Sequence, residues 1–467
     1  MSDAVQKLDV SNVRRFKPYP AYKPSGVEWL GDVPEHWEVK AIKWESAVLR
    51  GASPRPIDDP VYFDDEGEYA WVRISDVTSA GMYLEETTQR LSELGSSLSV
   101  RLYTGQLFLS IAGSVGKPCI AAIKCCIHDG FVYFPFWRGD SRFLYYIFAS
   151  GEPYKGLGKL GTQLNLNTDT VGAIRTGFPV VAEQRAIADF LDRETAKIDP
   201  LIAKKRALIE KLNEKRSALI SRTVTRGLPP DAACVAGFAP QPPLKPSGVN
   251  WVGDVPAHWE VKRIDFVSTV KARLGWKGLT ADEYVNEGFI FLATPNISGQ
   301  GEIDFENVNY ITEERYLESP EIMLRVRDVL IAKDGSTLGI TNVVRYLPAP
   351  GTVNSSIAVI RPKRHDRIDS RFLFRWLTSN PIQGIIQQMK DGQGVPHLFQ
   401  ADNKKFPVVL PPFPEQLAIA EFLDRGTLTL DSLVAVIAGA IDRLQEYRTA
   451  LITAAVTGKI DVRGTAA

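Results

Sequence analysis

Residues 23–42 read KPSGVEWLGDVPEHWEVKAI, and residues 245–264 read KPSGVNWVGDVPAHWEVKRI. The two stretches are identical at 16 of 20 positions and lie at a constant offset of 222 residues. A match of this length at a fixed spacing indicates an internal duplication, so the chain is interpreted as two copies of one unit.

A second pair of matching stretches closes each copy. Residues 183–199 read EQRAIADFLDRETAKID, and residues 415–431 read EQLAIAEFLDRGTLTLD, at an offset of 232 residues. Because the offsets of 222 and 232 differ by 10 residues, the two middles differ in length, and their sequences hardly match. Constant ends around a variable middle predict two readers on one frame, each adapted to a different target.

The composition is that of a soluble globular protein, with 44% hydrophobic and 24% charged residues. At 467 residues the chain is too long to fold around a single hydrophobic core, and its length fits about two to four domains. We expect a cytoplasmic protein without a membrane segment, because no secretory signal and no apolar run near ~20 residues is present. The four cysteines form no CxxC pair, so no metal site is predicted. A net charge of zero makes nucleic-acid binding less expected, because such proteins usually carry a basic surplus. It does not exclude that function, because binding depends on how the charges are distributed over the surface.

Both middles alternate strand-like pieces with Gly and Ser turns and then reach a short helix. The first middle predicts strands at 69–74, 106–111 and 131–134 and a helix at 143–149. The second predicts strands at 289–293, 328–332 and 356–360 and a helix at 369–378. The shared order predicts the same α+β domain in both copies.

Each copy ends in a long helix whose apolar residues recur every seven positions. The second helix carries Leu423, Leu430, Ile437, Leu444 and Leu451, with Leu433, Ala440 and Tyr447 at the three-residue offset. The first carries Leu191, Ile198, Leu212 and Leu219 in the same register, with Leu201 and Leu208 at the offset and Lys205 replacing one core position. Pro200 predicts a kink or break near Asp199. The matching seams predict that the two helices pack on each other.

Motifs for catalysis are missing. There is no base-flipping methyltransferase loop, no glycine-rich cofactor loop, and no motif of zinc proteases, serine hydrolases or nucleotide hydrolases. We therefore expect no enzymatic activity. The alternative is a metal-dependent endonuclease built on a repeated Glu-x-Lys, although alternating strand residues explain that pattern better. Its residues would be Glu38, Lys40, Glu260 and Lys262, with Asp32 and Asp254 as possible metal partners.

The frame resembles the specificity subunit of type I restriction-modification systems. The resemblance is carried by SGVEWLGDVPEHWEV and SGVNWVGDVPAHWEV, and by the pattern Pro-x-x-x-Glu-Gln-x-x-Ile-Ala-x-Phe-Leu-Asp at 179–192 and 411–424. It covers nearly the whole chain and implies two α+β target-recognition domains separated by two long helices packed as an antiparallel coiled coil. Each domain would read one half of a bipartite double-stranded DNA site, and the helices would fix the gap.

The same resemblance implies the partners. Two methyltransferase subunits would dock on the frame, and restriction subunits would join the full complex, in DNA methylation and prokaryotic host defence. S-adenosylmethionine, ATP and Mg would be bound by those partners and not by this chain. The residues expected to bind the partners are Glu183, Gln184, Ile187, Phe190, Glu415, Gln416, Ile419 and Phe422.

The repeats set the expected domain boundaries. We expect an N-terminal tail (1–22), a first target-recognition domain (23–178), a first spacer helix (179–226), a proline-rich linker (227–244), a second target-recognition domain (245–410), a second spacer helix (411–460) and a C-terminal tail (461–467).

Candidate DNA-binding residues are polar side chains in the loops of each middle, where glycine lets the backbone approach a phosphate and polar groups read base edges. In the first domain they are Ser53, Arg55, Arg73, Ser114, Lys117, Gln163 and Asn165. In the second they are Lys271, Arg273, Lys333, Ser336, Asn354 and His397. A protein scaffold that reads no DNA is the third hypothesis, beside the endonuclease.

Overall fold

The computed structural model describes residues 16–464 except 156, 158–165, 274–278, 280, 298–301 and 391–403. The chain divides into two compact units: residues 1–206 with 438–467, and residues 207–437. Each unit contains one α+β domain, which keeps the name recognition domain from the expectation of the sequence, and one end of each long helix. Among the described residues, no helix combines the length and the apolar character that crossing a bilayer requires.

The recognition domain of the first unit is built on two small sheets. Its strands are β4 (Leu49–Arg50), β5 (Tyr69–Val72), β6 (Tyr83–Leu84), β7 (Gln89–Leu91), β8 (Val100–Leu102), β9 (Leu107–Ser110), β10 (Pro118–Ala121), β11 (Cys125–Ile127) and β12 (Phe131–Tyr133). One sheet has the order β4-β12-β9-β10-β6, and the other has the order β7-β5-β11-β8. The helices are α1 (Ile74–Ser79), α2 (Glu93–Ser97), α3 (Ser141–Ala149) and α4 (Thr168–Ala173). Fully buried strands such as β9 and β10 explain the short continuous apolar runs of this middle.

The recognition domain of the second unit repeats this topology. Its strands are β17 (Ser268–Lys271), β18 (Phe289–Leu292), β19 (Asn309–Ile311), β20 (Val329–Ala332), β21 (Thr341–Val343), β22 (Gly351–Val353) and β23 (Ile357–Pro362). The sheets have the orders β17-β23-β20-β21 and β19-β18-β22. β18 runs parallel to β22 as β5 runs parallel to β11, and the other strand pairs in the two sheets of the second unit are antiparallel. The helices are α7 (Ile264–Val267), α8 (Glu313–Leu317), α9 (Ser370–Leu377) and α10 (Asn380–Lys390). The predicted α+β domain is confirmed in both copies, and the seven strands that they share have the same order. β6 and β8 of the first copy have no counterpart among the described strands of the second.

The repeated frame closes each domain by pairing its first strand with its last. In the first unit the hairpin of β1 (Tyr22–Pro24) and β2 (Asp32–Pro34) leads into β3 (Glu38–Ala41), which pairs with β13 (Arg175–Phe178). In the second unit β14 (Leu244–Pro246) and β15 (Asp254–Pro256) lead into β16 (Glu260–Arg263), which pairs with β24 (Pro407–Leu410). A short helix, α6 (Pro230–Val235), lies inside the segment that the sequence predicted as a plain linker.

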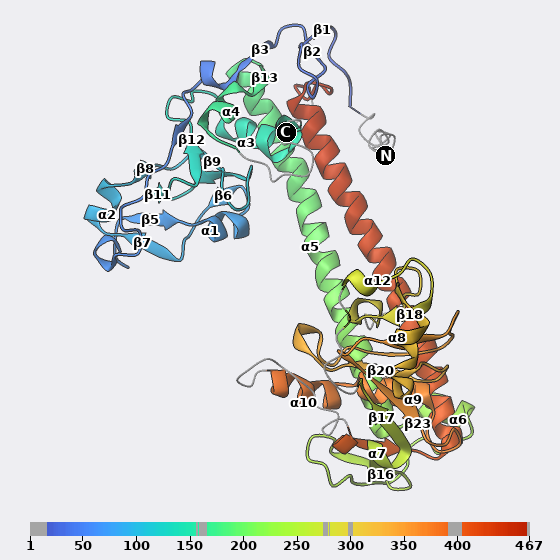
Figure 1. Ribbon diagram of the computed structural model, residues 1–467. Helices are drawn as coiled ribbons and strands as arrows, with labels where there is room; N and C mark the ends of the chain where they lie inside the picture. Colours follow the sequence, from blue (N-terminus) through green and yellow to red (C-terminus); the bar gives the residue numbers. More distant parts are fainter. Residues whose placement is uncertain are drawn as a thin grey trace. The chain divides into compact units, whose positions relative to one another are not determined.

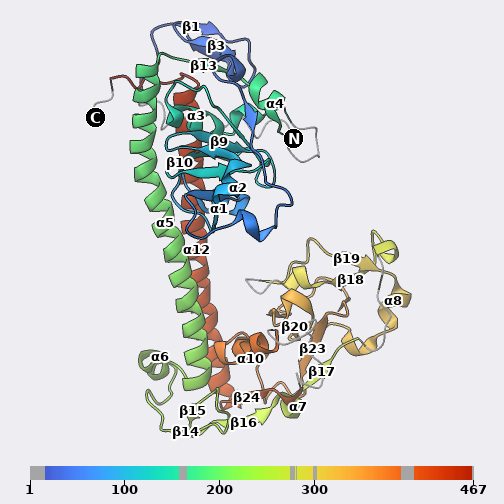
Figure 2. The same cartoon turned by 90° about the vertical axis from the view of Figure 1, so that its left-hand side faces the viewer.

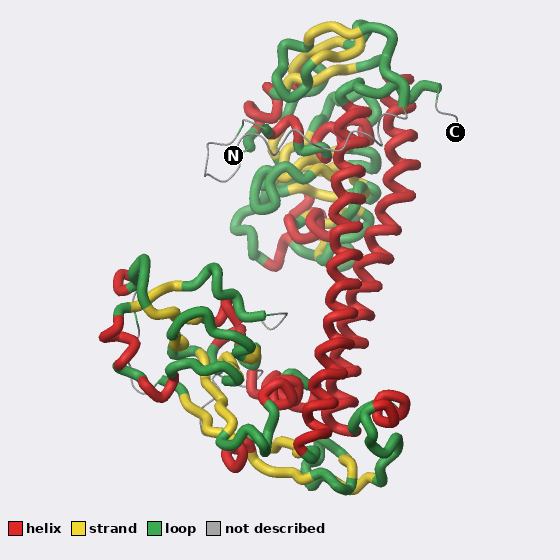
Figure 3. The backbone as a smooth tube through the Cα atoms, turned by 90° about the vertical axis from the view of Figure 1, so that its right-hand side faces the viewer, coloured by secondary structure: helices red, strands yellow, loops and turns green. Residues whose placement is uncertain are grey.

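Two long helices, α5 (Val181–Arg226) and α12 (Phe413–Val456), follow the two domains. Within the first unit Asp199 Oδ1 accepts a hydrogen bond from Arg448 Nε at 2.7 Å, and within the second Arg216 Nε lies 3.0 Å from Asp431 Oδ1. Between these contacts α5 advances by 17 residues while α12 recedes by 17, so the helices pack antiparallel. Both helices are continuous in Figure 1 and Figure 2, and they run alongside each other in Figure 3.

The helix seam differs from its prediction at two points. The sequence predicts a kink or a break near Asp199; α5 continues through Pro200, so the helix does not break there. Residues four positions after the heptad residues lie on the same face of a straight helix and are also buried in the seam. Ile202, four after Ile198, and Ile441, four after Ile437, are each 7% exposed. The leucines predicted at the three-residue offset are exposed instead: Leu201 by 48%, Leu208 by 46% and Leu433 by 46%.

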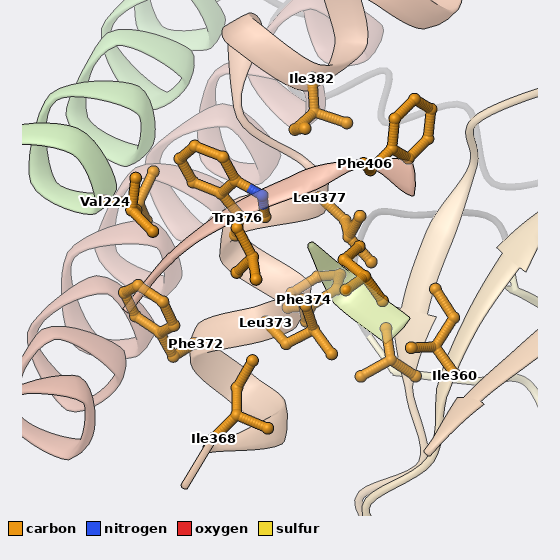
Figure 4. Close-up of a cluster of buried hydrophobic side chains, with 14 of the residues drawn as sticks. Val224, Ile360, Ile368, Phe372, Leu373, Phe374, Trp376, Leu377, Ile382 and Phe406 are labelled. Carbon is orange, nitrogen blue, oxygen red and sulfur yellow. The ribbon is translucent and has the colours of Figure 1, made fainter. Parts of the chain in front are cut away.

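The core of the second unit joins its recognition domain to the helix segments of that unit. Phe372, Trp376 and Leu377 of α9 are fully buried and belong to one cluster with Val224 of α5 and Ile419 of α12. Figure 4 shows Phe372 and Trp376 close to Val224, with Ile360 of the sheet on the other side of the helix. The recognition domain is therefore held against the helices by a continuous apolar core.

Candidate nucleic-acid interface

In the first unit, two loops lie side by side where β9 and β11 end. The backbone N–H of Ile111, after β9, donates to the carbonyl of Gly130, between β11 and β12, at 2.8 Å. Exposed backbone with glycine at positive φ, as at Gly113, lets this edge approach another molecule closely. Five of the predicted DNA-binding residues lie in or next to these loops.

Ser53 and Arg55 contact the second loop through one carboxylate. Ser53 Oγ donates to Asp129 Oδ1 at 3.1 Å, and the Arg55 guanidinium lies 3.4 Å from Asp129 Oδ2. The Arg55 side chain is 75% exposed, so its ion pair with Asp129 is open to water and to competing anions. Asp129 therefore holds Arg55 near the loop and leaves its remaining donors accessible.

Ser114 and Lys117 of the first loop converge on Thr78 of α1. Lys117 Nζ donates to the Thr78 carbonyl at 2.6 Å, and Ser114 Oγ lies 3.1 Å from Thr78 Oγ1. Burial lowers the pKa of Lys117. Arg73, the residue before α1, is exposed, and its backbone N–H donates to the Asp76 carboxylate at 2.8 Å. The geometry places Arg73, Ser114 and Lys117 around the two ends of one short helix.

His128 connects the two groups of residues. Burial lowers its pKa, the adjacent Asp129 opposes that effect, and the nearby charge of Arg73 lowers the pKa further. The imidazole also accepts a hydrogen bond from the Gly130 N–H at 2.8 Å through Nδ1, which fixes the loop. Arg73 therefore lies near His128, and Arg55 lies beside the adjacent Asp129. The edge as a whole presents cationic donors suited to phosphates and base edges.

The second unit places its loops in the same way. The backbone N–H of Lys333, after β20, donates to the carbonyl of Ser356, between β22 and β23, at 2.8 Å. Asn354 accepts a hydrogen bond from the Ser356 N–H at 3.1 Å, and Lys333 Nζ lies 3.3 Å from Asp334 Oδ2. Ser336 is exposed on the next turn. Lys333, Ser336 and Asn354 are therefore brought to one edge, at the position of the loops in the first unit.

The other candidates of the second unit have different surroundings. Lys271 is exposed at the end of β17. The Arg273 side chain is 2% exposed and pairs with Glu318 at 3.3 Å, which does not favour contact with a base. Gln163, Asn165 and His397 lie outside the described residues.

The repeated Glu residues, expected to bind partners, are bonded inside each unit. Glu183 is 5% exposed and accepts hydrogen bonds from the Tyr19 hydroxyl at 2.8 Å and from Trp37 Nε1 at 2.9 Å, with His36 Nε2 at 2.8 Å. The second unit repeats this cluster: Glu415, also 5% exposed, contacts Trp259 Nε1 at 3.1 Å and His258 Nε2 at 2.8 Å. These bonds explain why the two repeated sequence blocks occur together.

The neighbouring Gln residues attach the helix to the recognition domain. Gln184 accepts from the Asp140 N–H at 3.1 Å and donates to the Pro179 carbonyl at 2.9 Å. Gln416 makes the matching bonds to Asp369 at 2.9 Å and Pro411 at 2.8 Å. Ile187, Phe190 and Ile419 are buried as well, and Phe422 is partly buried against the core. These positions favour a role within the chain over direct contact with a partner.

The sequence did not single out several residues at these sites. His128 and Asp129 order the β11–β12 loop, and Thr78 receives both Ser114 and Lys117. Their only signal in the sequence was a position between strand-like pieces, which other polar residues share.

The endonuclease alternative gains no support from the geometry. Glu38 accepts a hydrogen bond from Lys40 Nζ at 2.8 Å on an exposed strand edge, which is an ordinary surface pair. Across the described part of the chain, no group of three or more His, Cys, Asp or Glu side chains is arranged to hold a metal ion.

Comparison with known proteins agrees with this geometry. The family model described as "Type I restriction modification DNA specificity domain" matches twice, at residues 34–211 and 256–437. The MjaVIII specificity subunit of Methanocaldococcus jannaschii is 22% identical over 446 residues, covering 92% of this chain and 94% of that protein. The EcoKI specificity subunit of Escherichia coli is 23% identical over 210 residues, 44% of each chain.

A solved structure from work on complex assembly of the type I R-M system shares the fold. Its TM-score is 0.60 at 16% identity, over 91% of this chain and 98% of that one. Because the two matches to the family model together span most of the sequence and each contains one recognition domain, the chain belongs to the family of type I restriction-modification DNA specificity domains.

Proposed function

We propose that this chain is the sequence-reading subunit of a type I restriction-modification complex, with each recognition domain reading one half of a bipartite site in double-stranded DNA. The observation that carries the proposal is the pair of adjoining loops at the same position in both units, joined by the same backbone bond but lined by different side chains. Arg55, Arg73 and Lys117 are the proposed contacts of the first reader, and Lys333, Ser336 and Asn354 those of the second.

Two different readers on one chain specify a split and asymmetric sequence, whereas a symmetric dimer would specify a palindrome. The antiparallel helices are proposed as the ruler between the half-sites. The chain is proposed to carry no cofactor. Two methyltransferase subunits, and restriction subunits in a full complex, would supply S-adenosylmethionine, ATP and Mg in the prokaryotic cytoplasm.

The test is methylome sequencing of a host that expresses this chain with its methyltransferase. We expect one split motif, modified on both strands, that is lost when the chain is deleted. Lys117→Ala should weaken or relax only one half of the motif, and Lys333→Ala only the other. Lys124→Ala is the matched control, because Lys124 pairs with Glu68 on the surface of the first domain, outside the two loops. A motif that persists after deletion of the chain would refute the proposal.

Insertions in the helices test the ruler separately. Residues added near Ala203 in α5 or near Ala435 in α12 should change the gap and leave both half-sites as they were. An unchanged gap would show that the helices do not set the distance.

A further inference from the structure

An exposed aromatic side chain recurs at one position of both copies, away from the reading loops. Trp44 is 76% exposed and Phe266 is 67% exposed, and they stand at the 222-residue offset of the frame. Each follows the frame strand, β3 or β16, that closes its domain. Single exposed apolar residues are ordinary, but a large aromatic exposed at the same place in both copies points to a shared use.

A cation accompanies each ring although the sequence does not preserve its position. Lys43 Nζ lies 5.9 Å from the centroid of the Trp44 ring, and the Arg263 guanidinium lies 5.9 Å from that of Phe266. The cation precedes its ring by one residue in the first copy and by three in the second. What the copies share is therefore the chemistry of the surface: an exposed aromatic face beside a positive charge.

In the second unit this surface is hollowed into a cavity of about 610 Å³. Its apolar walls are Phe266, Pro412 and Phe413, which begins α12. Four cationic side chains and two carboxylates also line it: Lys262, Lys363, Arg364, Arg367, Glu260 and Asp366. The cavity is therefore apolar at its walls and positive in net charge.

The first unit exposes apolar side chains at the matching positions. Val180 and Val181, which correspond to Pro412 and Phe413 at the 232-residue offset, are 68% and 39% exposed. Phe136 is 66% exposed, and its backbone N–H donates to Ser46 Oγ, two residues after Trp44, at 3.1 Å. The start of each long helix is thus bordered by the same kind of uncovered surface.

We infer that these two surfaces, defined by Trp44 with Val180 and by Phe266 with Phe413, are docking sites for two copies of one protein. The inference rests on the proposed function, which requires two methyltransferase subunits, and it assigns the occupant as an acidic segment of that subunit carrying an apolar side chain. The reading loops differ between the copies because the half-sites differ, whereas a surface that recurs must meet the same partner twice. The outer surface of duplex DNA is dominated by phosphates, and its apolar groups are small, whereas an acidic protein segment supplies negative charge together with a large apolar side chain for the rings.

The test uses the full chain and its purified methyltransferase, with stoichiometry measured by native mass spectrometry and affinity by titration. The wild-type chain should bind two methyltransferase subunits. Trp44→Ala and Phe266→Ala should each weaken one site by about 10-fold or more, leaving one subunit bound, and the double variant should lose both. Leu94→Ala with Leu317→Ala is the matched control, because these side chains are 50% and 56% exposed elsewhere in the two units.

The charge of the cavity is tested with Lys363→Glu combined with Arg364→Glu, which should weaken only the second site and reduce its salt dependence. A wild-type chain that binds no methyltransferase would refute the proposed function and this inference together. A double aromatic variant that still binds two subunits with unchanged affinity would refute the docking surface alone. Retained stoichiometry with weakened DNA binding would also overturn it, because the rings would then face DNA.

Discussion

Replacing Glu183 by alanine should lower the free energy of unfolding of the first unit by much more than the loss of one surface carboxylate would. The carboxylate is 5% exposed and receives the Tyr19 hydroxyl at 2.8 Å and Trp37 Nε1 at 2.9 Å, both inside the core of the frame. Each buried donor left without an acceptor costs about 1–3 kcal/mol, so the two together predict a loss of roughly 4 kcal/mol. His36 is 43% exposed, so water replaces its bond at little cost.

Hydrogen exchange with mass spectrometry measures this loss, because it reports the opening free energy of each unit separately. Peptides of residues 16–50 and 181–200 should lose protection in Glu183→Ala, while peptides of the second unit keep theirs. Glu183→Gln retains one acceptor and should lose about half as much. Glu210→Ala is the control, since Glu210 is exposed on the same helix. If Glu183→Ala and Glu210→Ala exchange alike, the reasoning from buried donors is wrong.

Three further predictions concern other parts of the fold. Burial lowers the pKa of His128 in the folded chain, so on acidification the unfolded chain binds a proton at this histidine before the folded chain does. The free energy of unfolding should therefore fall as the pH drops below about 6.5. His128→Gln should remove this contribution to the pH dependence of stability, measured by acid unfolding. Asp424→Asn should lower the free energy of unfolding of the second unit by about 3 kcal/mol, measured by urea denaturation. Arg375 is 4% exposed, and its guanidinium would lose the charged carboxylate that lies 2.8 Å away. Gly458→Ala should lower the melting temperature more than Gly227→Ala: both have positive φ, but only at 458 would a Cβ lie 2.3 Å from a proline side-chain atom.

Each of these has a clear counter-result. If the free energy of unfolding depends on pH in His128→Gln as it does in the wild type, groups other than His128 cause that dependence. Asp431→Asn serves as the control for Asp424, because the Asp431 side chain is 44% exposed, and equal effects of the two substitutions would contradict the burial argument. Equal melting temperatures for the two glycine variants would mean that the neighbouring proline yields without cost.

Much of the fold was predictable from the sequence because the signals were local or repeated. The six strands predicted in the middles correspond to β5, β9, β12, β18, β20 and β23, and both predicted helices are present as α3 and α9. The 222-residue offset predicted the same domain in both copies, which the matching order of their seven shared strands confirms. Pairings between distant strands, such as β3 with β13, have no local signal and needed the structure.

The helix seam and the sites were less predictable for physical reasons. A heptad pattern cannot distinguish i+3 from i+4 neighbours where apolar residues stand at both. It therefore predicts Leu201 in the seam, whereas Ile202 is the residue that is buried there. The Glu183 cluster combines residues about 150 positions apart, and its polar members resemble ordinary surface residues in the sequence. Position in a loop likewise does not tell whether an arginine is accessible: the Arg55 side chain is exposed, whereas the Arg273 side chain is buried.

The joint between each long helix and its frame has an evolutionary consequence. His36, Trp37, Glu183 and Gln184 and their counterparts in the second copy all belong to the repeated blocks and none to the loops of the middles, whereas Tyr19 lies before the first block. Recombination between copies, or between related genes, at these blocks would exchange a whole middle while keeping the bonds between the blocks. The bonds that the middles supply, from the Asp140 and Asp369 backbone N–H groups, require only a backbone donor at the same place. If each middle reads one half-site as proposed, one such genetic event changes one half of the specificity at little stability cost to the bonds around Glu183 and Glu415.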